Sequence, residues 1–395
     1  MSEEKFFKLI SGLLVFEKGE PVIRDLLLAG EKIAAIEKPG AIKINGLEVE
    51  QIEGTGLQAI PGFIDPHVHI TGGGGEGGPA TRAPEIQVED CVRFGVTGVI
   101  GLLGTDSVTR HPSSLLAKAR ALEIEGLNTW IMVGAYNLPT PTFTGSVRSD
   151  IALIDKVIGA GEIALSDHRS SQPTFEEFIK FVAECRVGGM LGGKAGLANL
   201  HLGDGPRGLD YLFRMVEETE IPATQVIPTH INRNRFLFAQ GLKWLEKGGY
   251  LDLTAMPEPV AEDEVSVLKA LIEIKARGDY LNQVTVSSDG NGSLPVFDQS
   301  GRLVGLTVAS QKDYFQTFQE LVRQKILTLS EASQVFSTNV AEIYKLKGKG
   351  KLSPGYDADL LLLNEELQLK YVFSRGKTMM ANGQIKARGT FSTRD

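Results

Sequence analysis

Four of the six histidines in this 395-residue chain stand where they could hold a metal ion. His67 and His69 lie two apart in Pro-Gly-Phe-Ile-Asp-Pro-His-Val-His, and that spacing places two side chains on the same face of a strand. His201 ends Leu-Ala-Asn-Leu-His, His230 ends Gln-Val-Ile-Pro-Thr-His, and Asp289 follows Val-Thr-Val-Ser-Ser. Imidazole and carboxylate are the ligands of catalytic zinc, which keeps one position open for water. The pattern therefore predicts a catalytic metal site.

The apolar runs before these residues recur through the middle of the chain and predict strands. Between them lie helix-like segments such as 113–122, 174–185 and 262–277. This alternation favours parallel β/α units, and eight of them would close a (β/α)₈ TIM barrel whose site lies at the strand C-terminal ends. An open doubly wound sheet is the alternative, and it is disfavoured because polar residues end nearly every strand. The candidate strands of this α/β region, 59–349, end near His67, Thr105, Tyr136, Glu162, His201, His230, Thr254 and Asp289.

The two ends of the chain differ from the middle. Residues 1–58 and 350–395 alternate short apolar stretches with glycine, proline and charged turns, a pattern typical of strands. We expect both ends to form one small β-sandwich domain, with 59–349 as the metal-dependent hydrolase barrel.

Composition excludes several other classes of function. The 41 basic and 49 acidic residues leave a net charge of −8 without a basic stripe, which disfavours nucleic acid or an anionic membrane as partner. The two cysteines form no C-x-x-C pair, and no apolar run approaches the length needed to cross a bilayer. The acidic first residues are not expected to act as a signal peptide. We expect a cytoplasmic protein.

The remaining histidines carry less information. His111 precedes Pro112 at the start of a helix-like segment, where capping or a surface role is expected. His168 lies in Ser-Asp-His-Arg, where it could orient a neighbouring group.

Several longer stretches resemble one family within the amidohydrolase superfamily, the isoaspartyl dipeptidases (β-aspartyl peptidases). They are Thr-Gly-Gly-Gly-Gly-Glu-Gly-Gly at 71–78, Gly-Leu-Leu-Gly-Thr-Asp at 101–106, Ser-Asp-His-Arg-Ser at 166–170 and Ser-Ser-Asp-Gly-Asn-Gly-Ser at 287–293. The resemblance covers nearly the whole chain. It implies a (β/α)₈ barrel with a small β domain, two zinc ions, a cytoplasmic oligomer that is often an octamer, and hydrolysis of small β-aspartyl dipeptides.

One position departs from the family pattern. The family has a lysine at the end of strand four, whose carbamate bridges the metals, whereas counting back seven residues from Arg169 reaches Glu162. A glutamate offers the same terminal carboxylate without CO₂, but its stem is shorter by roughly 3–4 Å of reach. We expect Glu162 to bridge two zinc ions in place of the carboxylated lysine.

The substrate that the resemblance implies matches several loop residues. A β-aspartyl dipeptide carries a free α-ammonium and α-carboxylate beside the scissile bond, and a second carboxylate beyond it. By resemblance Glu76 would hold the ammonium, and the guanidinium groups of Arg169 and Arg233 suit the carboxylates. Thr105 and Ser293 would add hydrogen bonds.

The expected mechanism is attack by a metal-bound hydroxide. Asp289 would accept the proton of the water and pass it to the leaving amine, and Tyr136 would steady the oxyanion.

Two other functions remain open. A cyclic amidase resembling dihydropyrimidinase or dihydroorotase would keep the metals but has no need for Glu76 opposite two arginines. A non-catalytic scaffold on the same fold usually loses metal ligands, whereas here only the bridging position differs.

Overall fold

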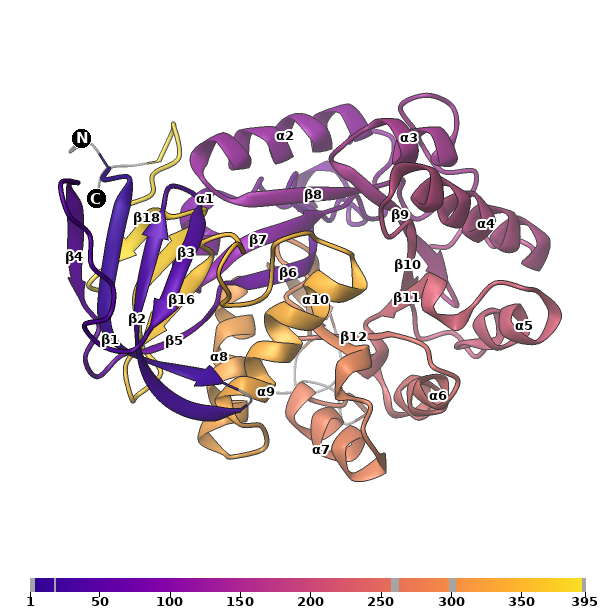
Figure 1. Ribbon diagram of the computed structural model, residues 1–395. Helices are drawn as coiled ribbons and strands as arrows, with labels where there is room; N and C mark the ends of the chain where they lie inside the picture. Colours follow the sequence, from indigo (N-terminus) through magenta and orange to yellow (C-terminus); the bar gives the residue numbers. More distant parts are fainter. Residues whose placement is uncertain (1–3, 18, 257–262, 298–302, 393–395) are drawn as a thin grey trace.

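The computed structural model describes residues 4–17, 19–256, 263–297 and 303–392. Figure 1 shows a β-rich part that holds both ends of the described chain, and beside it a part in which helices surround parallel strands.

The β-rich part is one hydrogen-bonded sheet of nine strands built from both ends of the chain. Its strands are β1 (Phe7–Glu17), β2 (Glu20–Ala29), β3 (Lys32–Glu37), β4 (Val49–Glu53), β5 (Gln58–Pro61), β16 (Leu360–Leu363), β17 (Leu369–Ser374), β18 (Lys377–Ala381) and β19 (Gln384–Ile385). Antiparallel pairing of β5 with β16, with Ala59 opposite Leu362, joins the two ends. A β domain from both termini was predicted; its sandwich form and the domain boundaries at 58 and 350 stay predictions.

The strand β16 shows why this sheet has apolar runs rather than strict alternation. All four of its leucines are buried. Leu360 and Leu362 pack into the core of the β domain, while Leu361 and Leu363 join the large core of the neighbouring part. Because side chains alternate across a strand, a strand that is covered on both faces must be apolar throughout.

Within the described residues, eight parallel strands form a barrel-like ring. They are β6 (Phe63–Val68), β7 (Val96–Gly101), β8 (Asn128–Val133), β9 (Val157–Leu165), β10 (Leu197–Leu202), β11 (Val226–Thr229), β12 (Leu251–Thr254) and β13 (Val284–Ser287). Hydrogen bonds join β6 to β11 in order and β12 to β13; β11 contacts β12, and a parallel bridge between Val68 and Gly290 brings β13 back to β6. The α/β, TIM-barrel-like fold is therefore confirmed.

Helices follow most of these strands and cover the ring from outside (Figure 1). They are α1 (Val88–Val92), α2 (Pro112–Glu125), α3 (Val147–Leu153), α4 (Phe175–Gly192), α5 (Asp210–Glu218), α6 (Arg235–Glu246), α7 (Val267–Arg277), α8 (Gln311–Arg323), α9 (Leu329–Ser333) and α10 (Asn339–Ile343). Short 3-10 turns lie at Pro79–Thr81, Ala223–Gln225, Ile231–Arg233 and Leu281–Gln283, and a π-helical segment, Gln334–Thr338, joins α9 to α10. A hairpin of β14 (Ser293–Phe297) and β15 (Leu303–Val308) separates β13 from α8.

The predicted helices begin close to where the structure has them. The Thr174 hydroxyl accepts from the Glu177 backbone N–H and Glu177 bonds back, so a capping box starts α4; the helix ends at Gly193 in the left-handed region, beyond the predicted limit of 185. Ser266 caps α7, which begins at Val267; the predicted start at 262 lies outside the described residues, and the predicted helix was wrong over 263–266, which are not helical. Over the described chain, no helix is both long and apolar enough to cross a membrane.

A buried ionic network fastens the barrel to the β domain. The Lys349 ammonium lies 2.6 Å from Asp357 Oδ2 and 2.8 Å from Asp359 Oδ2, and it donates to the Asn128 side-chain oxygen at the start of β8. The side chains of Lys349 and Asp359 are each only 7% exposed.

We expect Lys349→Met to lower the free energy of unfolding by about 3–5 kcal/mol, because two carboxylates then lose their buried cation. Urea unfolding measures this change. Lys351→Met is the matched control: its partner Glu342 is 58% exposed, so the loss should stay below about 1 kcal/mol. Equal stability losses in the two variants would contradict a special role for the network.

Candidate functional site

The first pair of candidate ligands, His67 and His69, lies at the end of β6, where all six strand residues are buried. The His69 backbone N–H donates to the Gly290 carbonyl at 2.8 Å, which ties this strand end to the segment after β13. Asp289 in that segment places Oδ1 3.1 Å from His69 Nε2 and 3.7 Å from His67 Nε2. The structure thus brings the His67–His69 pair together with Asp289, which is more than 200 residues away in the sequence.

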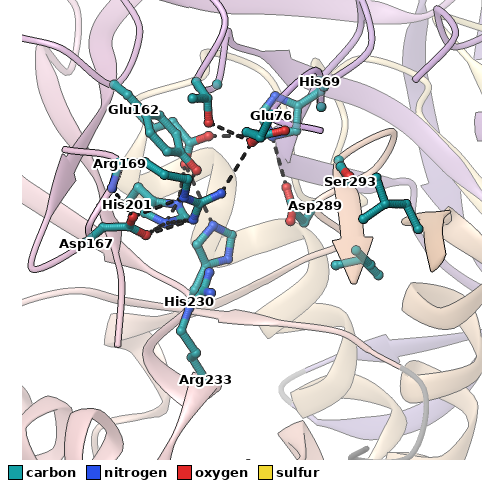
Figure 2. A pocket seen from close by; sticks show the side chains of 18 of the residues that line it. His69, Glu76, Glu162, Asp167, Arg169, His201, His230, Arg233, Asp289 and Ser293 are labelled. Carbon is teal, nitrogen blue, oxygen red and sulfur yellow. Dashed lines mark hydrogen bonds and ion pairs between the residues drawn. The ribbon is translucent and has the colours of Figure 1, made fainter. Parts of the chain in front are cut away.

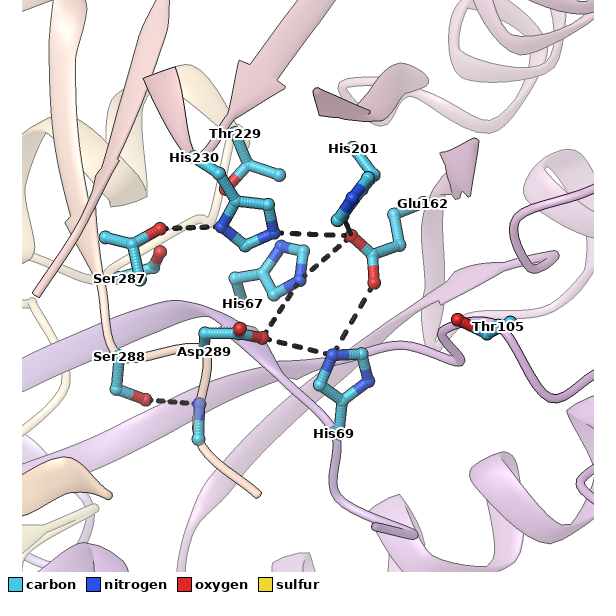
Figure 3. Close-up of polar contacts among 12 residues, drawn as sticks. His67, His69, Thr105, Glu162, His201, Thr229, His230, Ser287, Ser288 and Asp289 are labelled. Atoms are coloured by element: carbon cyan, nitrogen blue, oxygen red, sulfur yellow. Dashed lines mark hydrogen bonds and ion pairs between the residues drawn. The ribbon is translucent and has the colours of Figure 1, made fainter. Parts of the chain in front are cut away.

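The Glu162 carboxylate, on β9, lies between this group and the two other histidines (Figure 3). Its Oε1 is 3.5 Å from His69 Nε2, and its Oε2 is 3.3 Å from His67 Nε2. The same Oε2 is 3.3 Å from His201 Nδ1 and 3.7 Å from His230 Nε2. The shorter stem of glutamate therefore still reaches both groups.

The donor atoms of this cluster fit a divalent cation. Within the described part of the chain, several of its buried atoms have no hydrogen-bond partner: both nitrogens of His67, His69 Nδ1, both Glu162 oxygens and Asp289 Oδ1. Two triads could each hold an ion, His67–Glu162–His230 and His67–His69–Asp289. Of these atoms, His67 Nε2, the Glu162 oxygens and Asp289 Oδ1 face one another, and such converging lone pairs are what imidazole and carboxylate ligands offer to a metal.

Electrostatics at the cluster also favour positive charge. Burial alone would raise the pKa of Glu162, but His67, His201 and His230 hold it well below the usual range. Burial opposes a charge on His67, yet Glu162 and Asp289 outweigh burial and raise its pKa to about 9. A negative potential that favours a proton on His67 favours a metal cation there equally well.

His230 is fixed in a single orientation. Its backbone is left-handed (φ 60°) directly after β11, and its Nδ1 is hydrogen-bonded to the Thr254 hydroxyl at 2.7 Å, which leaves Nε2 for the cluster. Burial lowers the pKa of His230 to about 3, so the ring stays neutral, as a metal ligand must.

His201 is held by two residues of the same site. Its Nδ1 is 2.8 Å from the Tyr136 hydroxyl, and its Nε2 is 2.9 Å from Asp167 Oδ2. Asp167 also accepts two hydrogen bonds from the Arg169 guanidinium, at 3.0 and 2.7 Å, and one from the Arg169 backbone N–H at 2.7 Å. Burial would raise the pKa of Asp167, but His201 and Arg169 together lower it strongly, so the carboxylate stays ionised. Sequence analysis missed Asp167, although it lies inside the Ser-Asp-His-Arg stretch.

Two more buried carboxylates below the site were also missed. Asp252 accepts hydrogen bonds of 2.6 Å from the hydroxyls of Thr229, Thr285 and Ser287, which ties together β11, β12 and β13. Asp65 accepts from the backbone and hydroxyl of Ser288, the neighbour of Asp289. Only the apolar context of these aspartates in their strands could have suggested buried, hydrogen-bonded roles.

A cavity of about 520 Å³ opens over the cluster, and the predicted substrate residues line it (Figure 2). The Thr105 hydroxyl donates to Glu76 Oε1 at 2.8 Å, and Arg169 Nη1 lies 3.3 Å from the same oxygen. Arg233 and Ser293 line the cavity as well, and Arg233 Nε has no hydrogen-bond partner among the described residues. All five side chains predicted for the substrate therefore meet at this cavity.

The glycine-rich loop that carries Glu76 is anchored by Arg110, another residue that sequence analysis missed. This buried guanidinium donates to the backbone carbonyls of Thr71, Gly74 and Ala83. Gly72 has φ +79°, and a Cβ there would lie 2.1 Å from the Ala83 carbonyl, so the close turn requires glycine.

The two remaining histidines take peripheral places. His111 is the N-cap residue of α2, as expected, and lies exposed. His168 is exposed and lines the cavity.

Comparisons with known proteins agree with this site. A sequence profile of the amidohydrolase family matches residues 235–384. The solved structure of a β-aspartyl dipeptidase from Fervidobacterium islandicum AW-1, in complex with the dipeptide β-Asp-Leu, is 45% identical, with a TM-score of 0.91 over 98% of this chain and all of that one. A dihydropyrimidinase from Brevibacillus agri NCHU1002 shares the fold, with a TM-score of 0.65 at 18% identity over 97% of each chain.

Among curated proteins, an adenine deaminase from Halalkalibacterium halodurans is 23% identical over 91% of this chain. The chain spans 54% of that deaminase, about half of its length.

The contacts of Asp167 lead to a first test at the site. We expect Asp167→Asn to weaken zinc affinity about 10- to 100-fold, because the ring of His201 loses the carboxylate that orients it. Competition against a chromophoric chelator measures the affinity. Asp204→Asn, at an exposed residue of the same cavity, should leave it unchanged. If Asp167→Asn binds zinc as tightly as the parent protein, Asp167 does not orient His201.

Proposed function

Because this chain belongs to the β-aspartyl dipeptidase family of amidohydrolases and is a hydrolytic enzyme, we propose that it cleaves the isopeptide bond of β-aspartyl dipeptides at two zinc ions. The observation that carries the proposal is one cavity in which Glu76 and two arginines lie beside the buried His–Glu–Asp cluster. The β-Asp-Leu bound to the Fervidobacterium protein supports this choice of substrate.

The charges in the cavity match the free end of the aspartyl residue. An α-ammonium would bind Glu76, whose Oε1 is already a hydrogen-bond acceptor for Thr105. The α-carboxylate would bind the guanidinium of Arg233, which has an unused Nε, together with Arg169. In an α-linked peptide the α-carboxylate is consumed in the scissile bond, so only a β-linked aspartyl residue presents an ammonium and a carboxylate on the same carbon, and this arrangement would favour the β-linkage.

His67, His69 and Asp289 would hold one zinc ion, His201 and His230 the other, and Glu162 would bridge them in place of the carboxylated lysine. When bound, zinc lowers the pKa of water from ~15.7 towards ~7 and polarises the scissile carbonyl.

Asp289 and Tyr136 would carry out the proton transfers. Asp289 would accept the proton of the attacking water and deliver it to the leaving nitrogen. Burial, together with the charge of Glu162, raises the pKa of Tyr136 well above its usual value, so its hydroxyl keeps a proton to donate to the developing oxyanion. A cytoplasmic location and an octameric assembly stay predictions.

The substrate assay tests the proposal against the cyclic amidases. We expect hydrolysis of β-aspartyl-leucine, which is measured by the release of leucine. We expect little or no turnover of hydantoin or dihydroorotate, since neither cyclic amide carries the ammonium that Glu76 would bind. Turnover of the cyclic amides alone would replace this function with theirs. Absence of zinc and of any hydrolysis after zinc is added would indicate a non-catalytic scaffold.

Counting metals tests the bridging role of Glu162. We expect Glu162→Gln to hold fewer than two zinc ions per chain and to lose at least about 100-fold in turnover, because a neutral amide cannot neutralise two cations. Elemental analysis of purified protein gives the count. Glu184→Gln is the control, since Glu184 pairs with Arg148 on the surface. Two firmly bound zinc ions in Glu162→Gln would exclude the bridge.

A further inference from the structure

The hairpin of β14 and β15 is part of the wall of the cavity. Its register places Ser293 opposite Val308 and Pro295 opposite Leu306. Its base is held by backbone hydrogen bonds from Ala309 to Gly292 and from Asn291 to Ala309, and Gly73 of the glycine-rich loop donates to the Asn291 carbonyl. The hairpin is therefore fixed to the loop that carries Glu76.

The hairpin supplies the aliphatic part of the cavity. Among the lining residues that the structure describes, Leu294 and Leu306 are the aliphatic ones, and both belong to the hairpin. The other lining residues are glycines, charged or polar side chains, and Tyr136. Figure 2 shows Ser293, at the start of β14, across the cavity from Asp167 and Arg169. The cavity thus has a charged side and an apolar side.

The apolar side continues along the hairpin. Leu306 is 44% exposed and Val308 is 42% exposed, and residues two apart on a strand share one face. Val308 lies opposite Ser293, so this is the face that carries Ser293. When an apolar group of a ligand covers this aliphatic surface, binding becomes more favourable because apolar area is removed from water.

The chemistry of the substrate decides which of its groups can cover the aliphatic surface of the hairpin. This step rests on the proposed function. In a β-aspartyl dipeptide the aspartyl half carries the ammonium and a carboxylate, so the side chain of the C-terminal residue is the one part that can be apolar. Asp289 would protonate the nitrogen of that residue, and β14 begins four residues after Asp289. The leaving nitrogen would then lie near the base of the hairpin.

We propose that Leu306 forms the subsite for the side chain of the C-terminal residue, so that the enzyme prefers β-aspartyl dipeptides whose leaving residue is aliphatic. The hairpin then determines specificity for the leaving residue, while Glu76 and the arginines recognise the aspartyl half.

The test compares kcat/KM for β-aspartyl-leucine with kcat/KM for β-aspartyl-glycine. The two dipeptides differ only in the aliphatic side chain. We expect Leu306→Asn to lower the leucine-to-glycine ratio about three- to tenfold, since a partly exposed aliphatic contact is lost. Leu306→Ala should lower it less. Val304→Asn is the matched control: Val304 is on the same strand and 59% exposed, but it lies at the register shift between Gly305 and Leu303 and does not line the cavity, so the ratio should not change.

An unchanged ratio in both Leu306 variants, with both dipeptides still hydrolysed, overturns the subsite and leaves the proposed function intact. A shift of the sedimentation coefficient in the Leu306 variants with an unchanged ratio would overturn it too, and would assign the hairpin to a contact between subunits. If the parent enzyme hydrolyses neither dipeptide, the proposed function fails and the subsite fails with it.

Discussion

The site is organised around one buried anion, the carboxylate of Glu162. This side chain is fully buried, and burying an isolated carboxylate is unfavourable by many kcal/mol unless positive charge or hydrogen bonds compensate. Compensation comes from imidazole nitrogens of His67, His69, His201 and His230, which surround it at 3.3 to 3.7 Å. Neutral imidazoles alone satisfy an anion poorly, so the cluster is most stable when protons or metal cations share it. The barrel must therefore hold the ends of β6, β9, β10 and β11 in one place.

The same requirement extends to the groups that hold the imidazole rings in place. Each imidazole presents the correct nitrogen only if its other nitrogen is fixed, and Thr254 does this for His230 as Asp167 does for His201. Asp252 in turn binds hydroxyls from β11 and β13, which keeps the ends of those strands aligned. A barrel with a purely apolar interior would not fix them in this way, which explains why the interior contains ionisable groups despite the cost of burying them.

Whether a feature of the fold or the site could be predicted depends on how far apart in the sequence its interacting residues lie. The strand ends and their metal-binding side chains were predictable, because an apolar run followed by histidine or aspartate is a local pattern, as at His201 and Asp289. Glu162 was found only by counting from a recognisable stretch. Asp167 and Arg110 were missed because their roles depend on contacts across loops, with His201 and with the Ala83 carbonyl, that no local spacing encodes. The hairpin after β13 was missed because a short exposed strand pair resembles a loop in sequence.

The segment from Ser287 to Ala309 joins the two halves of the site. Asp289, with its left-handed backbone (φ 52°), turns the chain from the barrel into the cavity, and the hairpin starts within the next turn. The group proposed to protonate the leaving nitrogen and the wall proposed to contact the leaving side chain therefore belong to one continuous piece of chain. Loops on a fixed barrel can change without disturbing the strands beneath them. Exchange of hairpin residues could therefore alter which dipeptides are cleaved, while the ligands on β6, β9, β10 and β11 and the charge of Glu162 stay the same.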